Sequence, residues 1–333
     1  MATSKKGLST NPSSFRTWWK NLRAQRRMAT TVASIERSPN IVALEGPFNH
    51  EHVFVRGVRL HLATAGSPTN PLVLLIHGAF GGWFDYREVI SPLADAGFHV
   101  AAIDLRGYGM SDKPPAGYDL RHAAGDISSV IAALGHDDAI LVGSDTGASI
   151  AWVSATMYPE RVRGLVSLGA IHPSDMNRAM LLKPYLFLPD LGRRLVFGVP
   201  TPAYRLLSVA IARSSQREIT SNTSVSFQRS NAFREITKLR KKALGIDHTL
   251  GAIVRTNRFL AGQGPAKHAK SLVSAPVLIL KQNTQRWEYL AHLAKTRSCG
   301  KLHILSIPGG FELPYWENPA EFARGVEEFA RGL

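Results

Sequence analysis

Asp145 lies at the centre of the sequence Gly-Ser-Asp-Thr-Gly (residues 143–147), directly after the apolar run 139–142. A strand, a tight turn and a helix in this order would raise the central side chain above the edge of a sheet, where it could attack a ligand. A carboxylate is a nucleophile that needs no base of its own. The ester that it forms must be hydrolysed by water, however, and that water needs a general base.

The chemistry of such an elbow needs a histidine near the C-terminus as its base. The stretch 308–319, which should carry this residue, contains no histidine. Histidine is the side chain whose pKa lies near neutrality, whereas Glu312 stands in this stretch. The ordinary pKa of a glutamate is about 4.3, so Glu312 accepts a proton poorly at neutral pH unless burial raises its pKa. If Glu312 faced Asp145, repulsion would raise the pKa of one of the two, and they could share a proton.

The net charge of +15 on 333 residues is concentrated in two segments. Residues 1–46 carry +6 and residues 173–270 carry +12, so the remainder carries −3. Such segments favour an anionic membrane surface, an acidic protein partner or nucleic acid, and solvated helix faces are the alternative explanation. A single cysteine, Cys299, excludes an internal disulfide and suits a reducing compartment. We therefore expect a cytoplasmic protein, with the membrane surface as a second location.

The hydrophobic pattern predicts alternating strands and helices. Residues 52–62 alternate around Gly57 as a hairpin does. Short apolar runs predict further strands at 72–76, 100–103, 139–142, 165–168, 277–280 and 302–305. Segments of helical length lie at 122–134, 147–158, 286–296 and 319–331. This order predicts an α/β protein with a mostly parallel sheet and helices on both faces.

Three parts follow from this pattern. Residues 47–172 and 271–333 form the core, and residues 173–270 form a basic helical cap above the carboxyl ends of the strands. Residues 1–46 form a basic extension with one predicted amphipathic helix.

The predicted N-terminal helix places Trp18 and Trp19 on one face, and basic residues that include Arg23 and Arg27 flank this face. This composition is typical of a helix that lies in a membrane interface. Packing of the tryptophans on their own domain or on a second copy of the chain is an equal alternative.

Three motifs in this order resemble the α/β-hydrolase superfamily and, within it, the epoxide hydrolases. They are the elbow at 143–147, the loop 76–87 (Ile-His-Gly-Ala-Phe-Gly-Gly-Trp-Phe-Asp-Tyr-Arg) and the loop 104–114 (Asp-Leu-Arg-Gly-Tyr-Gly-Met-Ser-Asp-Lys-Pro), and the likeness covers about residues 53–333. The resemblance implies an eight-stranded α/β-hydrolase fold with a helical cap. It also implies an attack of the elbow carboxylate on an epoxide, followed by ester hydrolysis with a histidine base, an orienting acid and cap tyrosines.

By this resemblance, Asp145 is the nucleophile and the N–H groups of Ala79 and Thr146 form the oxyanion hole. Glu312 takes the position of the base, Gln285 that of the acid, and the tyrosine positions read Ile253 and Val254. The same alignment places four residues around the pocket: His77, Phe80, Trp83 and His172. For Trp83 we favour core packing over a place in the pocket, and for His77 a role in bracing its loop.

The substitutions at the base, the acid and the cap lead to one main hypothesis and one alternative. The main hypothesis is an epoxide hydrolase-like pseudoenzyme that has lost standard turnover and binds a small apolar ligand, a protein partner or a membrane surface. The alternative is an active epoxide or ester hydrolase that uses Asp145 with Glu312 as base. Nucleic acid is not favoured, because no recognised binding motif accompanies the charge. The sequence predicts no metal and no cofactor, and it implies no particular oligomeric state.

Overall fold

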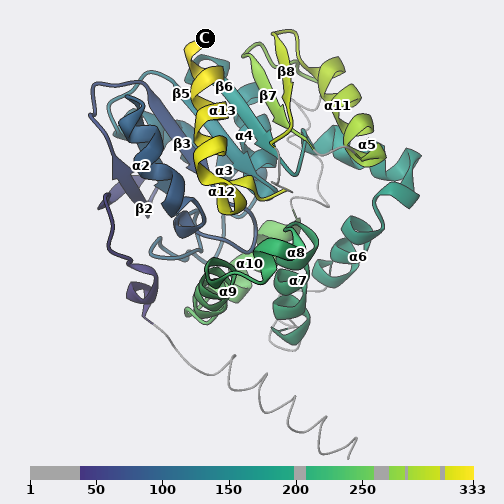
Figure 1. Ribbon diagram of the computed structural model, residues 1–333, viewed down its shortest axis with the longest axis horizontal. Coiled ribbons are helices and arrows are strands. Elements are labelled where there is room, and N and C mark those ends of the chain that lie inside the picture. Colours follow the sequence, from purple (N-terminus) through teal and green to yellow (C-terminus); the bar gives the residue numbers. More distant parts are fainter. Residues whose placement is uncertain (1–37, 199–207, 259–269, 282–283, 308–311) are drawn as a thin grey trace, which may run out of the picture.

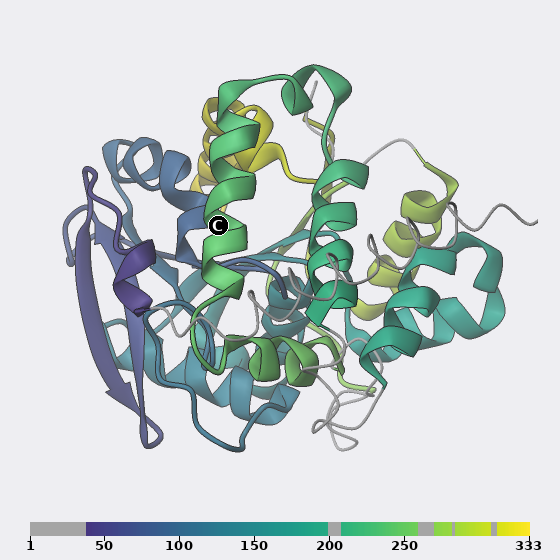
Figure 2. The same cartoon turned by 90° about the horizontal axis from the view of Figure 1, so that it is seen from below.

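A computed structural model of the protein describes residues 38–198, 208–258, 270–281, 284–307 and 312–333 (Figures 1 and 2). Its centre is an eight-stranded sheet in the order β1-β2-β4-β3-β5-β6-β7-β8. The strands are β1 (Asn49–Val55), β2 (Val58–Ala65), β3 (Leu72–Ile76), β4 (His99–Ile103), β5 (Ala139–Ser144), β6 (Val162–Leu168), β7 (Val277–Leu280) and β8 (Leu302–Leu305). Strands β3 to β8 pair in parallel and the β1–β2 hairpin is antiparallel, so the predicted mostly parallel sheet is confirmed.

The hairpin turns at Arg56 and Gly57, which both have positive φ angles of 51° and 77°. Two successive residues of this kind form the turn whose twist matches that of antiparallel strands. The glycine that the sequence pattern singled out therefore lies in the turn that joins β1 to β2.

Helices cover both faces of the sheet. Helices α3 (Leu120–Ala133), α4 (Thr146–Met157) and α11 (Gln285–Arg297) share one hydrophobic core with the sheet. Helices α2 (Arg87–Asp95) and α13 (Pro319–Arg331) lie in the other core. Successive residues of β3 alternate between the two cores, because side chains of a strand point to opposite faces: Leu74 belongs to the first and Leu75 to the second.

Between β6 and β7 the described chain forms helices and no strand, from Pro173 to Arg258. These are α5 (Pro173–Leu182), α6 (Leu188–Phe197), α7 (Ser208–Ser221), α8 (Val225–Gln228), α9 (Asn231–Leu244) and α10 (Thr249–Asn257). Helices α6 to α10 lie together on one side of the sheet in Figure 1. Short elements complete the fold: η1 (Pro39–Val42), η2 (Trp83–Tyr86), η3 (Pro159–Arg161), η4 (Pro184–Leu186) and α12 (Pro314–Glu317). No helix in the described part of the chain combines the length and the apolarity that a membrane crossing needs.

Candidate active site

Asp145 joins β5 directly to α4 in a strained backbone conformation, with φ 52° and ψ −116°. A non-glycine residue with positive φ stores strain of about 1–3 kcal/mol, which the surrounding structure must hold in place. The flanking glycines permit the tight turn. A Cβ atom at Gly147 would lie 2.2 Å from the carbonyl oxygen of Ile76, and one at Gly143 would lie 2.5 Å from the carbonyl oxygen of Gly147. The predicted elbow is therefore present.

Both carboxylate oxygens of Asp145 are bound by one arginine of the cap. Arg193 donates from Nη1 to Oδ1 over 2.9 Å and from Nη2 to Oδ2 over 2.8 Å. The N–H of Ala79 also donates to Oδ2, over 3.2 Å. The side chains of Asp145 and Arg193 are only 18% and 15% exposed, so solvent screens this ion pair weakly.

The pKa of Asp145 reflects this pairing. Burial alone would raise the pKa of the carboxyl group. The charge and hydrogen bonds of Arg193, together with the N–H groups of Ala79 and Thr146, outweigh burial and hold the pKa below its ordinary value. Asp145 is therefore an anion at neutral pH, stabilised by donors on both oxygens.

Arg193 itself is fixed in place by residues of the cap and of the loop 76–87. It belongs to α6, and its Nε donates to the side-chain oxygen of Asn257 in α10. Its guanidinium group lies 5.0 Å from the centre of the Phe80 ring. A planar, delocalised cation that stacks on an aromatic ring and binds a carboxylate through two nitrogens is well suited to a rigid contact.

Glu312, at the expected base position, is paired with residues of α11. Its Oε1 accepts hydrogen bonds from Nη1 of Arg286 over 3.0 Å and from Nε1 of Trp287 over 2.9 Å. Burial raises the pKa of Glu312, against the opposing effect of Arg286. The charge of Asp145 also contributes to this rise, although no hydrogen bond joins the two carboxylates.

Gln285, at the expected acid position, is the first residue of α11 and is exposed. The neighbouring Arg286 reaches Glu312 instead, and it also pairs with Asp190 of α6 over 3.4 Å. Where the resemblance implies a histidine oriented by an acid, this protein has a glutamate bound by an arginine. The negatively charged member of the pair is thus at the base position, and the positively charged member is on α11 beside the acid position.

The histidines near this end of the sheet are engaged elsewhere. His77 donates from Nδ1 to the carbonyl of Gly78 and accepts the N–H of Leu105 at Nε2. Both ring nitrogens therefore bind backbone atoms of the loops 76–87 and 104–114. His172 accepts the N–H of Ser174 at Nδ1, and burial lowers its pKa to about 3, which makes it a poor base. No histidine of the described residues contacts the carboxylate of Asp145.

Trp83 lies in the core rather than at the pocket. It is fully buried, and its ring packs edge-on against Phe48 and His50, both at 5.0 Å. Its Nε1 donates to the carbonyl of Val42, so it anchors the segment before β1.

The two residues at the expected tyrosine positions, Ile253 and Val254, are buried in α10 and carry no hydroxyl group. Thr146 begins α4, and its buried hydroxyl has no partner among the described residues.

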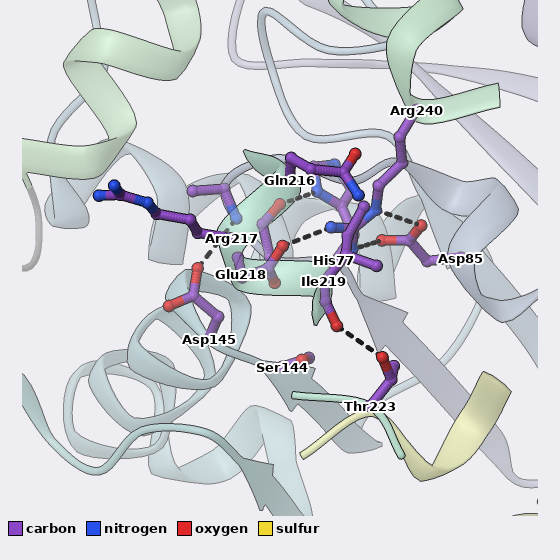
Figure 3. A network of polar contacts seen from close by, with 12 residues as sticks. His77, Asp85, Ser144, Asp145, Gln216, Arg217, Glu218, Ile219, Thr223 and Arg240 are labelled. Atoms are coloured by element: carbon purple, nitrogen blue, oxygen red, sulfur yellow. Dashed lines mark hydrogen bonds and ion pairs between the residues drawn. The ribbon is translucent and has the colours of Figure 1, made fainter. Parts of the chain in front are cut away.

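A second buried ionic network joins the loop 76–87 to the cap (Figure 3). Arg240 of α9 donates to both carboxylate oxygens of Asp85, over 3.1 Å and 2.8 Å, and from Nη1 to Glu218 of α7 over 2.5 Å. Burial raises the pKa of Glu218, while Arg240 opposes this effect and the charge of Asp145 adds to it. Glu218 is therefore the member of this network that lies toward Asp145, as Figure 3 shows.

The sequence did not single out Arg193, Arg286 or Glu218. Two signals were available. The stretch 281–286 contains no carboxylate although the resemblance requires an acid there, and it contains Arg286, a cation that could pair with Glu312. Arg193 had no comparable signal, because it is one of seventeen basic residues between 173 and 270.

Trp18, Trp19, Arg23 and Arg27 lie outside the described residues. Within the described ranges, no group of three His, Cys, Asp or Glu side chains is placed to hold a metal ion.

Comparison with known proteins gives one consistent result. The family model described as alpha/beta hydrolase fold matches residues 71–243. Epoxide hydrolase 4 of Mus musculus is 34% identical over 165 residues, which cover 48% of this chain and 46% of that protein. An AB hydrolase superfamily protein of Bacillus subtilis is 35% identical over 153 residues, which cover 42% of this chain and 54% of that protein. The chain thus spans about half the length of these curated relatives.

A solved structure with the same fold is a putative epoxide hydrolase from Pseudomonas aeruginosa. It superposes with a TM-score of 0.74 at 20% identity and covers 87% of this chain and 97% of that chain. At this level of identity the similarity demonstrates the fold.

Proposed function

This chain belongs to the alpha/beta hydrolase fold family and is epoxide hydrolase-like, and we propose that it binds a small apolar ligand without the turnover of a hydrolase. The observation that carries this proposal is the contact between Asp145 and Arg193. Both oxygens of the nucleophile are bound by a cation, which lowers their reactivity toward a ligand carbon. Any ester that did form would meet no described imidazole to activate water.

The surroundings of the two arginines support an apolar ligand. The guanidinium groups of Arg193 and Arg286 lie over the rings of Phe80 and Phe187, at 5.0 Å and 5.5 Å from the ring centres. Trp287 lies beside them and donates to Glu312. Sites lined by aromatic rings with a few fixed polar groups are typical of pockets for small molecules.

A second candidate function is hydrolysis by Asp145 with Glu312 as the base. Its support is that burial raises the pKa of Glu312 and that Oε2 of this residue has no partner among the described residues. A buried carboxylate with a raised pKa can serve as a general base near neutrality.

Styrene oxide distinguishes the two candidates with the purified protein. We expect the melting temperature to rise with the concentration of styrene oxide and then to saturate, because a ligand that binds only the folded state stabilises it. We expect the diol to form no faster than with Asp145→Asn. Diol formation that depends on Asp145 would refute the proposal and support hydrolysis. The lack of a saturable shift would refute apolar binding at this site.

A further inference from the structure

The outer surface of the cap carries an unusual group of exposed apolar side chains. We call the group the leucine corner, and it comprises Leu181, Leu182, Tyr185, Leu188 and Leu195. Leu181 and Leu195 are 81% and 80% exposed, so almost nothing in the structure covers them. Ten large apolar side chains are strongly exposed among the described residues, and half of them lie in this stretch of fifteen. Scattered exposed leucines need no explanation, whereas a cluster marks an interaction surface.

The local structure forces these side chains outward. Helix α5 ends at Leu182, the short helix η4 begins at Pro184, and α6 begins at Leu188. Leu188 and Leu195 are seven residues apart and therefore share one face of α6. Arg193 lies on the opposite side of α6 and donates a hydrogen bond to Asp145. In Figures 1 and 2, α6 lies at the rim of the molecule, far from the β1–β2 hairpin.

The charge around the leucine corner is positive. Arg178 is exposed and Lys183 is partly exposed, and the Nζ of Lys183 lies 4.1 Å from the centre of the Tyr289 ring. The acids of the two helices are already neutralised: Asp175 pairs with Arg297, and Asp190 pairs with Arg286. Residues 173–198, which carry the leucine corner, contain four basic and two acidic residues and so have a net charge of +2.

From these observations we infer that the leucine corner docks on the surface of an anionic lipid bilayer. Leucine and tyrosine side chains beside basic residues fit a lipid interface, where the apolar groups enter the acyl boundary and the cations meet anionic headgroups. A second copy of the chain is the weaker occupant, because it would bring another cap of charge +12. This inference stands apart from the proposed ligand binding and from the predicted role of residues 1–46.

Vesicle binding by the full chain tests the inference. The vesicles are made of phosphatidylcholine alone or with about a third phosphatidylserine, which supplies the negative surface. We expect binding to the anionic vesicles only. The double substitution Leu181→Asn with Leu195→Asn should weaken this binding about tenfold or more, because two apolar side chains no longer enter the lipid.

Phe54→Asn is the matched control, since Phe54 is 80% exposed but lies in β1. It should bind vesicles as the native chain does, and all variants should keep the native melting temperature. A variant with Trp18→Ala and Trp19→Ala separates the N-terminal segment, and the effect of the two leucines must persist in that background. Three results would overturn the inference: unchanged binding by the leucine variant, equal binding to neutral vesicles, or a dimer that the leucine variant abolishes.

Discussion

Under the proposed function, the substitution Arg193→Met should free the Asp145 carboxylate to react once with an epoxide. Asp145 would lose both donors of its ion pair, and the N–H groups at Ala79 and Thr146 would remain. A free oxygen of Asp145 can then attack a carbon of styrene oxide. A C–O bond forms, the epoxide C–O bond breaks, and the released alkoxide takes a proton from water. The product is a hydroxyalkyl ester on Asp145.

The size of the effect follows from the two hydrogen bonds between Arg193 and Asp145, of 2.9 Å and 2.8 Å. Hydrogen bonds to charged groups contribute about 1.5–3 kcal/mol each. We take the lower end of this sum, about 3 kcal/mol, as the stabilisation that an attacking oxygen must give up. This corresponds to a rate roughly 100-fold higher in the variant.

Intact mass spectrometry measures this reaction directly. The variant should gain the mass of one styrene oxide, and a peptide map should place the addition at Asp145. The ester should persist, because no described histidine contacts this carboxylate to activate water. Arg194→Met is the matched control on the same helix, since Arg194 donates to Asn177. The reasoning fails if the native chain is alkylated as fast as Arg193→Met, or if the variant releases diol repeatedly.

Three further outcomes follow. Gly147→Ala should lower the free energy of unfolding, measured in urea, by about 2–4 kcal/mol, because its Cβ would lie 2.2 Å from a backbone oxygen. Gly192→Ala is the control, since its Cβ would meet nothing within 4 Å and should not destabilise the protein. Arg240→Met should cost about 3–5 kcal/mol by leaving Asp85 buried without its cation, and a loss below 1 kcal/mol would contradict the network. The depressed pKa of Asp145 stabilises the fold above its unfolded value near 3.9, so the stability advantage over Asp145→Asn should be lost as pH falls through the folded pKa.

Much of the framework was predictable because it depends on local pattern. Buried parallel strands are short apolar runs, and the runs at 72–76 and 277–280 coincide with β3 and β7. The Gly-Ser-Asp-Thr-Gly sequence predicted the elbow for an equally local reason, since only glycine fits beside the backbone of β3.

The contacts of the site depend instead on pairs of residues far apart in the sequence. Arg193 meets Asp145 from 48 residues away, and Arg286 meets Glu312 from 26. Seventeen basic residues of the cap had the same composition signal, and only the packing of α6 decides which one reaches the elbow. Trp83 shows the converse case, because core packing was favoured for it from the sequence and its side chain is fully buried.

Helix α6 carries Arg193 on one side and Leu188 and Leu195 on the other. A rigid helix cannot shift one of its faces without the other. If lipid contact changes the position of α6, it changes the free energy of the Arg193–Asp145 pair as well. By thermodynamic reciprocity, a ligand that binds only when the pair is separated would then change the affinity for lipid by the same factor by which lipid changes the affinity for that ligand. The lipid contact of α6 and the ion pair at the elbow would in that case respond to the same movement of the helix.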